Sequence, residues 1–250
     1  MKAVLSNQPV TVKSQYMPEL VDHRYFYDEN DPKLGQYVGY YTCGLAAKAI
    51  GTMLLATSNL RFADRDFLKS LPEYINNPSV TGFMIEQAVL SSIALNGLNI
   101  RQETNRSMEV KLFKGPTVRL DPNTENPVLY IPTAFNFKGI DGLIVSKEFE
   151  PPPGMTKRRL LLLPLQITVA SKHKDSHETF FNDWKAWIAG LTEIEVVPQF
   201  IWITPEESAN NHLRKGAQKG WPAHDEVKIP LRQVNRSIAD MYDDTKRHLI

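Results

Sequence analysis

Four oxygen-bearing side chains in the central part of the chain could together hold a divalent cation: Glu86, Asp141, Gln166 and Thr168. A hard cation such as Mg²⁺ prefers carboxylate and carbonyl oxygens as ligands. A bound metal lowers the pKa of its water and offsets charge that develops on a phosphate. Gln166 and Thr168 are two residues apart, so on a strand both side chains point to the same face. The candidate chemistry is therefore hydrolysis of a phosphodiester.

Glu86 falls in a segment that predicts a helix over residues 79–96, with Gly97 as its C-terminal stop. Its apolar positions form one buried stripe, and Glu86 borders that stripe instead of facing away from it. The stripe comprises Phe83, Val89, Ile93 and Leu95.

Asp141 and Gln166 fall in segments that predict strands. Asp141 stands just before an apolar strand, and Gln166 ends the nearly continuous apolar run LLLLPLQITVAS. Such a run is typical of a strand buried on both faces in the middle of a sheet. The next segments predict a helix in HETFFNDWKAWIAGL and a parallel strand in VVPQFIWIT, which together make a β-α-β crossover. A charged, glycine-rich loop then leads to a short strand, VKIPL, and a final helix, RQVNRSIADMYDDTKRHL. We predict an α/β domain with a mixed sheet and helices on both faces.

The bulk composition limits the classes of function. Net charge is +1 over 250 residues, so nucleic-acid binding would need a local basic patch. Cys43 is the single cysteine, which excludes an internal disulfide and is typical of a reducing compartment. The longest apolar stretch, Leu160–Leu165, is too short to span a membrane, and the N-terminus lacks a secretory h-region. We therefore expect an intracellular protein with no membrane partner.

Two short basic clusters could contact a phosphate backbone. The first, Arg158 and Arg159, precedes the central apolar run. The second, Arg214, Lys215 and Lys219, lies in the late loop. Each cluster would also be ordinary as a solvated loop, so their interpretation depends on whether they edge the same cleft as Asp141 and Gln166.

Three segments resemble the PD-(D/E)XK nuclease-like domains of Crinkler and retrotransposon-hot-spot type proteins in fungi and oomycetes. They are Gly82-Phe-Met-Ile-Glu86, Phe137-Lys-Gly-Ile-Asp141 and Leu165-Gln-Ile-Thr-Val-Ala-Ser-Lys-His173. The resemblance covers about residues 80–205. It implies a restriction-endonuclease-like fold, with residues 1–78 as an N-terminal elaboration of strands and helices and residues 79–250 as the core. It also implies metal-dependent cleavage of nucleic acid by an effector that acts in a host nucleus. We expect DNA in preference to RNA as the nucleic acid, and a host or other protein as a further partner.

The resemblance assigns Glu86, Asp141 and Gln166 to a Mg²⁺ or Mn²⁺ ion. Lys172 would contact phosphate, and His173 would contact phosphate or move protons. The wider superfamily has Asp/Glu-x-Lys where this chain has Gln166 and Thr168. A neutral glutamine weakens the expected metal affinity, so a nuclease-like fold that binds nucleic acid without cutting it, or a non-enzymatic effector or interaction domain, stays open beside an active nuclease.

Other chemistries remain as alternatives. Cys43 precedes a predicted helix, whose N-terminus would lower the thiol pKa, as in a cysteine protease. Such an enzyme would use Gln36 for its oxyanion hole, His173 or His177 as base, and Asn182 or Asp183 to orient that base. His173 and His177 are also spaced for a zinc site, which would need a third ligand such as His212 or His224. Each residue of the Asp141 group could alternatively be structural: a turn aspartate, a sheet-end glutamine and a solvated helix glutamate.

Overall fold

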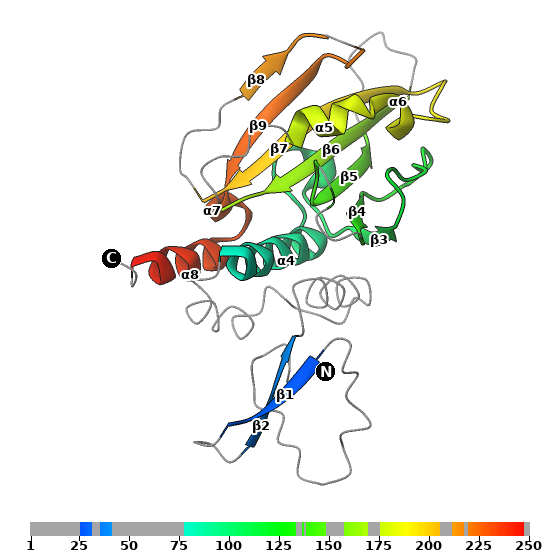
Figure 1. Cartoon of the computed structure of the whole chain (residues 1–250). Helices are drawn as coiled ribbons and strands as arrows, with labels where there is room; N and C mark the ends of the chain where they lie inside the picture. Colours follow the sequence, from blue (N-terminus) through cyan, green and yellow to red (C-terminus); the bar gives the residue numbers. More distant parts are fainter. Residues whose placement is uncertain are drawn as a thin grey trace.

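The computed structural model describes residues 26–31, 36–41, 78–133, 137, 139–148, 158–169, 176–205, 212–217 and 220–247. Several predicted features lie outside these residues: the helices of the N-terminal elaboration, Cys43, Lys172, His173 and Lys219. Within residues 1–78 the described strands are β1 (Phe26–Asp31) and β2 (Gln36–Tyr41), which form a separate antiparallel two-stranded sheet (Figure 1).

The remaining elements form an α/β fold around one mixed sheet. In chain order they are α4 (Pro78–Asn96), η3 (Gln102–Thr104), β3 (Glu109–Phe113), β4 (Val128–Pro132), β5 (Gly142–Lys147), β6 (Arg159–Ile167), α5 (Ser176–Asn182), α6 (Trp184–Trp187), β7 (Glu195–Thr204), β8 (His212–Lys215), β9 (His224–Pro230), α7 (Leu231–Val234) and α8 (Arg236–Arg247).

The main sheet has the strand order β3-β4-β5-β6-β7-β9-β8. Strands β4, β5 and β6 form an antiparallel meander, whereas β7 pairs in parallel with both β6 and β9. The parallel pairing of β6 and β7 confirms the crossover predicted from the sequence. Strand β6 is the middle strand of the seven, and Leu160–Leu165 are buried on both of its faces, as its apolar run predicts.

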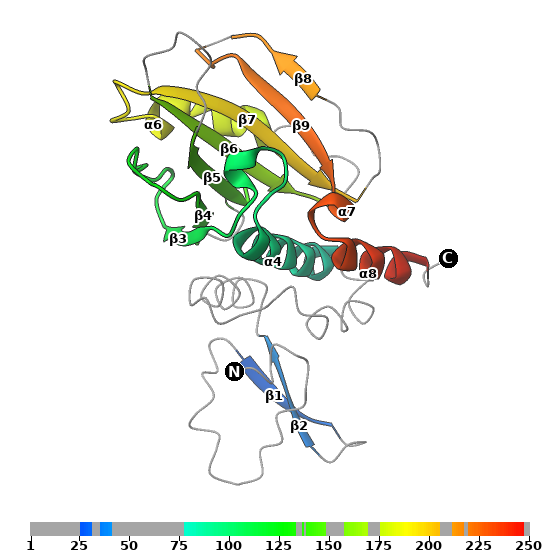
Figure 2. The same ribbon diagram turned by 180° about the vertical axis from the view of Figure 1, so that it is seen from behind.

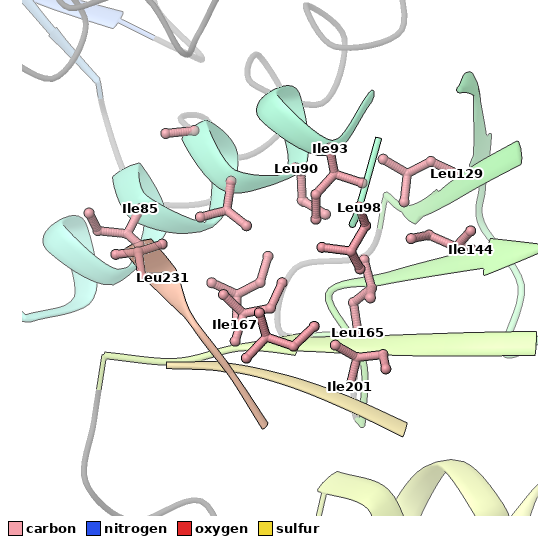
Figure 3. Close-up of a cluster of buried hydrophobic side chains, with 14 of the residues drawn as sticks. Ile85, Leu90, Ile93, Leu98, Leu129, Ile144, Leu165, Ile167, Ile201 and Leu231 are labelled. Atoms are coloured by element: carbon pink, nitrogen blue, oxygen red, sulfur yellow. The ribbon is translucent and has the colours of Figure 1, made fainter. Parts of the chain in front are cut away.

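Helices cover both faces of this sheet (Figures 1 and 2). Alternate residues of β6 enter different hydrophobic clusters because successive side chains of a strand point to opposite faces. Leu163 and Leu165 pack with residues of α4 and α8, the cluster shown in Figure 3, which we call the α4 side. Leu160 and Leu162 pack with Phe180, Trp184 and other aromatic residues of α5, α6 and β7, which we call the α5 side.

Helix α4 matches its prediction closely at both ends. Gly97 stops it in the left-handed conformation, with φ of 80°, and its N–H donates to the Ile93 carbonyl at 2.8 Å. A side chain at Gly97 would also collide with the backbone of Arg106, because its Cβ would lie 2.3 Å from that nitrogen. The predicted apolar stripe of α4 is wrong at Leu95, which is 46% exposed. Ile85 and Leu90, which are not part of the predicted stripe, are among the most deeply buried residues of the helix.

The predictions miss three details in the last third of the chain. The expected charged loop contains β8, which pairs with β9, and β9 begins at His224, before the predicted VKIPL. The helix expected across HETFFNDWKAWIAGL is split into α5 and α6 at Asp183. The final helix is split at Asn235, whose backbone is extended and whose side-chain oxygen accepts the Ile238 N–H at 3.2 Å to cap α8.

Candidate functional site

Asp141 and Gln166 are in direct contact where β5 begins and β6 ends. Gln166 Nε2 donates a hydrogen bond to Asp141 Oδ2 at 2.7 Å. The backbone N–H of Ile167 donates to the same oxygen, also at 2.7 Å. The Asp141 N–H in turn donates to the Leu165 carbonyl at 2.8 Å, which continues the ladder one residue beyond the strand. The amide of Gln166 and the backbone N–H of Ile167 thus both orient the aspartate, and both of these donors are neutral.

Antiparallel pairing explains why residues 25 apart in the sequence meet. Gly142 lies opposite Leu165, which places Asp141 opposite Gln166 one step further along the ladder. Gly142 is also a point of close contact between α4 and the strand, because a Cβ at this position would lie 3.0 Å from Leu90 Cδ2. A glycine next to Asp141 therefore lets the helix lie directly over the start of β5.

Glu86 lies on the helix face that overlies this same end of the sheet. Residues four apart share a helix face, so Gly82 and Leu90 are its neighbours one turn before and one turn after. The Cβ position of Gly82 is 3.9 Å from Val169 Cγ2, and Leu90 contacts the start of β5 at Gly142. These two contacts place half-buried Glu86 over the region between Gly142 and Val169. Its Oε1 accepts a hydrogen bond from Gln87 Nε2 at 3.2 Å.

The candidate residues approach from two sides of the sheet. Leu165 and Ile167 belong to the α4 side, so alternation puts Gln166 and Thr168 on the α5 side, as predicted for a pair two residues apart. Glu86 comes from α4 on the opposite side. A common ion would therefore have to lie beyond the end of the sheet, around the Asp141 carboxylate. Thr168 is buried one residue past β6, and its N–H donates to the Ile203 carbonyl at 3.0 Å.

The part of the chain that the structure describes contains no group of three or more histidine, cysteine, aspartate or glutamate side chains arranged to hold a metal ion. The candidate ligands assigned from the sequence comprise two carboxylates, Glu86 and Asp141, and one amide, Gln166. Lys172 and His173 would follow Thr168 in the chain, but they lie outside the described residues.

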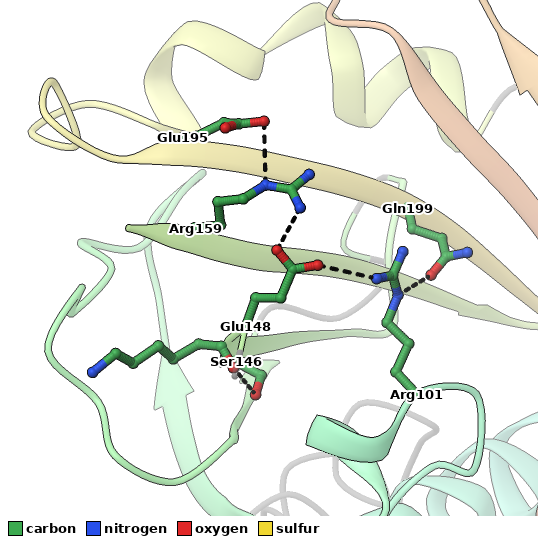
Figure 4. Close-up of polar contacts among 7 residues, drawn as sticks. Arg101, Ser146, Glu148, Arg159, Glu195 and Gln199 are labelled. Atoms are coloured by element: carbon green, nitrogen blue, oxygen red, sulfur yellow. Dashed lines mark hydrogen bonds and ion pairs between the residues drawn. The ribbon is translucent and has the colours of Figure 1, made fainter. Parts of the chain in front are cut away.

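The Arg158 and Arg159 cluster lies at the opposite end of β6 from Gln166. Seven residues separate Arg159 from Gln166, which corresponds to about 23 Å along a strand. Arg159 is engaged by two carboxylates, Glu148 at 2.5 Å and Glu195 at 3.3 Å (Figure 4). Arg158 is exposed and donates to Asn123 Oδ1 at 3.3 Å. This placement separates the first basic cluster from the Asp141 end, so the two do not edge one cleft.

The second basic cluster belongs to the outermost strand. Arg214 and Lys215 are in β8, three strands away from β6 in the sheet. Lys215 Nζ lies 3.7 Å from Glu226 Oε1, so its charge is partly compensated inside the protein. Lys219 lies outside the described residues.

The residues invoked for a cysteine protease or a zinc site have other contacts. His177 Nε2 lies 3.6 Å from Glu226 Oε1. Asn182 Oδ1 accepts the Trp221 indole N–H at 3.2 Å, so that amide already has a structural partner. Asp183 is exposed at the junction of α5 and α6. Cys43 and His173 lie outside the described residues, and neither alternative gains support from the residues around His177.

A polar cluster that the sequence did not indicate lies on the α5 side, between α5, β8 and β9. It contains His177, Lys215, His224 and Glu226, and burial lowers the pKa of His224 from its ordinary value of 6.5. The pairing of β8 with β9 creates this cluster. Its members are scattered over residues 177–226, and no local pattern connects them.

Family models, curated proteins and solved structures were each compared with the chain, and none of them matches it. Among the described helices, none combines the length and apolar character needed to cross a membrane.

Proposed function

We propose that this chain is a nucleic-acid-binding protein with a metal-dependent phosphodiesterase site at the Asp141 end of β5 and β6. The observation that carries the proposal is the 2.7 Å contact between Asp141 and Gln166 at the end of the sheet that α4, with Glu86, covers from the opposite side. The same residues carry the resemblance to PD-(D/E)XK domains of the Crinkler and retrotransposon-hot-spot type. A restriction-endonuclease-like core is accordingly the proposed identity of the α/β fold.

The order of the elements supports this proposal. The resemblance implies a helix with a glutamate, a strand with an aspartate and a following strand with Gln-x-Thr. The chain has α4 with Glu86, then Asp141 at the start of β5, then Gln166 and Thr168 at the end of β6. Asp141 and Gln166 are neighbours in space and not only in order, which a chance match of common residues would not require.

The donor set suits a hard cation such as Mg²⁺ or Mn²⁺, because carboxylates and amide oxygens are the ligands these ions take. Glu86, Asp141 and Gln166 would hold the ion, which when bound supplies a water of lowered pKa and positive charge at the phosphate. The Gln166 amide nitrogen faces Asp141, so its oxygen can join a shared ion only after the amide turns over. An amide has nearly the same shape in both orientations.

The protein's own groups fix the carboxylate in place. The Ile167 N–H is part of the β6 backbone and cannot move away from Asp141 without opening the strand end. Held in this way, Asp141 keeps one orientation whether or not a cation is present. Preorganisation of this kind reduces the free-energy cost of ordering the site when a cation binds.

The test is cleavage by the whole purified chain. Supercoiled plasmid, single-stranded DNA and RNA are each incubated with Mg²⁺, with Mn²⁺ and with EDTA, using wild type, Asp141→Asn and Asp183→Asn. Asp183→Asn is the matched control, since it neutralises an exposed carboxylate at the junction of α5 and α6 that is not among the proposed metal ligands. Metal-dependent cleavage that Asp141→Asn abolishes and Asp183→Asn preserves is expected. Cleavage that persists in Asp141→Asn would show that the site is elsewhere.

A second candidate function is binding without cleavage, as an effector or interaction domain. The neutral Gln166 favours it, because a cage with two carboxylates attracts Mg²⁺ less strongly than one with three. Fluorescence anisotropy of labelled DNA across a salt series separates the two: salt-sensitive binding with no product at any metal concentration supports this candidate. Absence of both binding and cleavage would overturn both proposals.

A further inference from the structure

Glu226 is the one described acidic side chain at the centre of a basic cluster on the α5 side. It extends from β9 and is 91% buried. His177 of α5 approaches its Oε1 to 3.6 Å and Lys215 of β8 approaches the same atom to 3.7 Å. Both separations are beyond hydrogen-bonding distance, and this buried oxygen has no hydrogen-bond partner among the described residues. At Glu226 itself, charge and not a directed hydrogen bond joins the side chains of α5 and β8 to that of β9, in addition to the backbone pairing of β8 with β9.

His224 lies two residues before Glu226 on the same face of β9, and it is 3% exposed. Its ring stacks on Phe181 with a centroid separation of 3.9 Å. Its Nδ1 lies 3.0 Å from the Pro222 carbonyl, which only accepts hydrogen bonds, so Nδ1 carries the proton of the neutral ring. Nε2 is then the bare nitrogen, and it is buried with no hydrogen-bond partner among the described residues.

Protonation at Nε2 would bury an N–H that has no acceptor in place, in a cluster already rich in positive groups. With the His224 ring neutral, the Lys215 ammonium faces the Glu226 carboxylate and these two charges balance. A proton on His224 adds a positive charge that no further carboxylate of the cluster offsets. Among the other charged side chains of α5 and β9, Glu178 and Lys228 are exposed to solvent, and Asp225 points to the opposite face of β9, so none of them restores the balance.

We propose that His177, Lys215, His224 and Glu226 form a proton-sensitive latch that releases the β8–β9 edge of the sheet from α5 on acidification. Strand β8 is the element most easily released, because it is the last strand of the sheet and pairs with β9 alone. The latch uses none of the residues of the Asp141 site, and the proposal does not require that site to bind metal.

Hydrogen exchange of the whole chain at pH 7.5 and 5.5, corrected for intrinsic exchange rates, tests the latch. The protection of amides in β8 and at the start of β9 is expected to fall more than that of amides in β4 and β5, because each pKa unit by which folding lowers the His224 pKa corresponds to up to a roughly tenfold change. Equal changes in both regions would overturn the proposal.

Two substitutions remove the protonation sites with little change of shape. His224→Phe keeps a ring on Phe181, and His177→Gln keeps a polar group toward Glu226. The double variant is expected to show the same β8 protection at both pH values. Asp225→Asn is the control, because Asp225 points to the opposite face of β9 and its loss should leave the acid response unchanged. An undiminished acid response in the double variant would contradict the latch.

A measurement on the wild-type chain covers the case in which His224→Phe fails to fold. Imidazole NMR signals of His177 and His224 and amide signals of β8 are followed together from pH 8 to pH 5. We expect the β8 amide signals to change with the midpoint of His224. Amide signals that change with a midpoint other than that of His224 would overturn the proposal.

Discussion

Polar contacts join β5 and β6 at both ends of the strand pair, but the groups that bind the carboxylate are neutral at one end and charged at the other. At one end Asp141 accepts hydrogen bonds from an amide and a backbone N–H, both neutral. At the other end Glu148 lies between two guanidinium groups, those of Arg159 and Arg101 (Figure 4). Glu148 is matched by cations within the fold, whereas the amide and the backbone N–H that bind Asp141 contribute no positive charge. This difference supports the proposal that the functional site lies at the Asp141 end.

The Glu148 end has the features of a structural ion network. The Glu148 side chain is 9% exposed, and Arg159 also reaches Glu195. Arg101 additionally donates to Gln199 Oε1 at 3.3 Å, which joins the segment after α4 to β7. Such a network holds the ends of three strands in register, and its strength depends on every member being present.

The largest expected effect comes from Asp141→Asn. It keeps the shape and the ability to accept the Ile167 N–H while it removes the charge, so metal-dependent cleavage should fall about 1000-fold with little change in stability. Initial rates at saturating Mg²⁺ and the urea midpoint measure the two quantities. A loss of stability as large as the loss of activity would make Asp141 a structural residue and remove the contrast between the ends.

Glu148→Gln should have the converse effect. It leaves two arginines at a largely buried site with Glu195 as the remaining carboxylate partner of Arg159, and we expect the free energy of unfolding to fall by about 3 kcal/mol. Urea denaturation gives this value. Cleavage per folded molecule should be unchanged, and a specific loss of cleavage without destabilisation would contradict the assignment of this end as structural.

Gln166→Glu makes the Asp141 end resemble a three-carboxylate cage. Without metal, two carboxylates would replace a 2.7 Å hydrogen bond, and the protein should lose about 2 kcal/mol of stability. Mg²⁺ should restore more stability to this variant than to wild type, because the ion neutralises the added charge. Thermal melting with Mg²⁺ and with EDTA compares them, and an identical metal response would argue against a shared ion.

Acidification is expected to lower the stability of the protein through His224 of β9, and not through the residues at either end of β6. Burial lowers its pKa in the folded state, so the unfolded chain takes up a proton first as pH falls below 6.5. The free energy of unfolding should therefore decrease by up to about 1.4 kcal/mol per pH unit from this residue, until the folded pKa is reached. Urea midpoints between pH 7.5 and 5 measure the slope, which should be shallower in His224→Phe.

The smallest effect is expected from Arg158→Ala. The side chain is exposed and makes one hydrogen bond at 3.3 Å to Asn123, so stability should change by less than about 0.5 kcal/mol. If the nucleic-acid site is confined to the Asp141 end, DNA affinity should also be unchanged in an anisotropy titration. A clear loss of affinity would extend the binding surface along the whole length of β6.

The sequence by itself determined the elements whose signals are local. The stop of α4 at Gly97 follows from the need for a left-handed residue there, and the central place of β6 follows from an apolar run that only a doubly covered strand tolerates. The parallel β6–β7 crossover follows from the helix between them. Asp141 and Gln166 could be selected because each ends or begins such a segment.

The tertiary structure alone decided what depends on distant partners. Arg101 and Gln199 are 98 residues apart, and His177 meets Glu226 only because β8 and β9 extend the sheet beyond β7. Arg159 appeared in the sequence as part of a basic run, yet two carboxylates from other strands engage it. Periodicity and capping act within a few residues, whereas the charge state and partners of a buried side chain are set by strand order and register. For this reason the sequence could indicate Asp141 and Gln166 as candidates, but only the fold distinguished their end of the sheet from the Glu148 end.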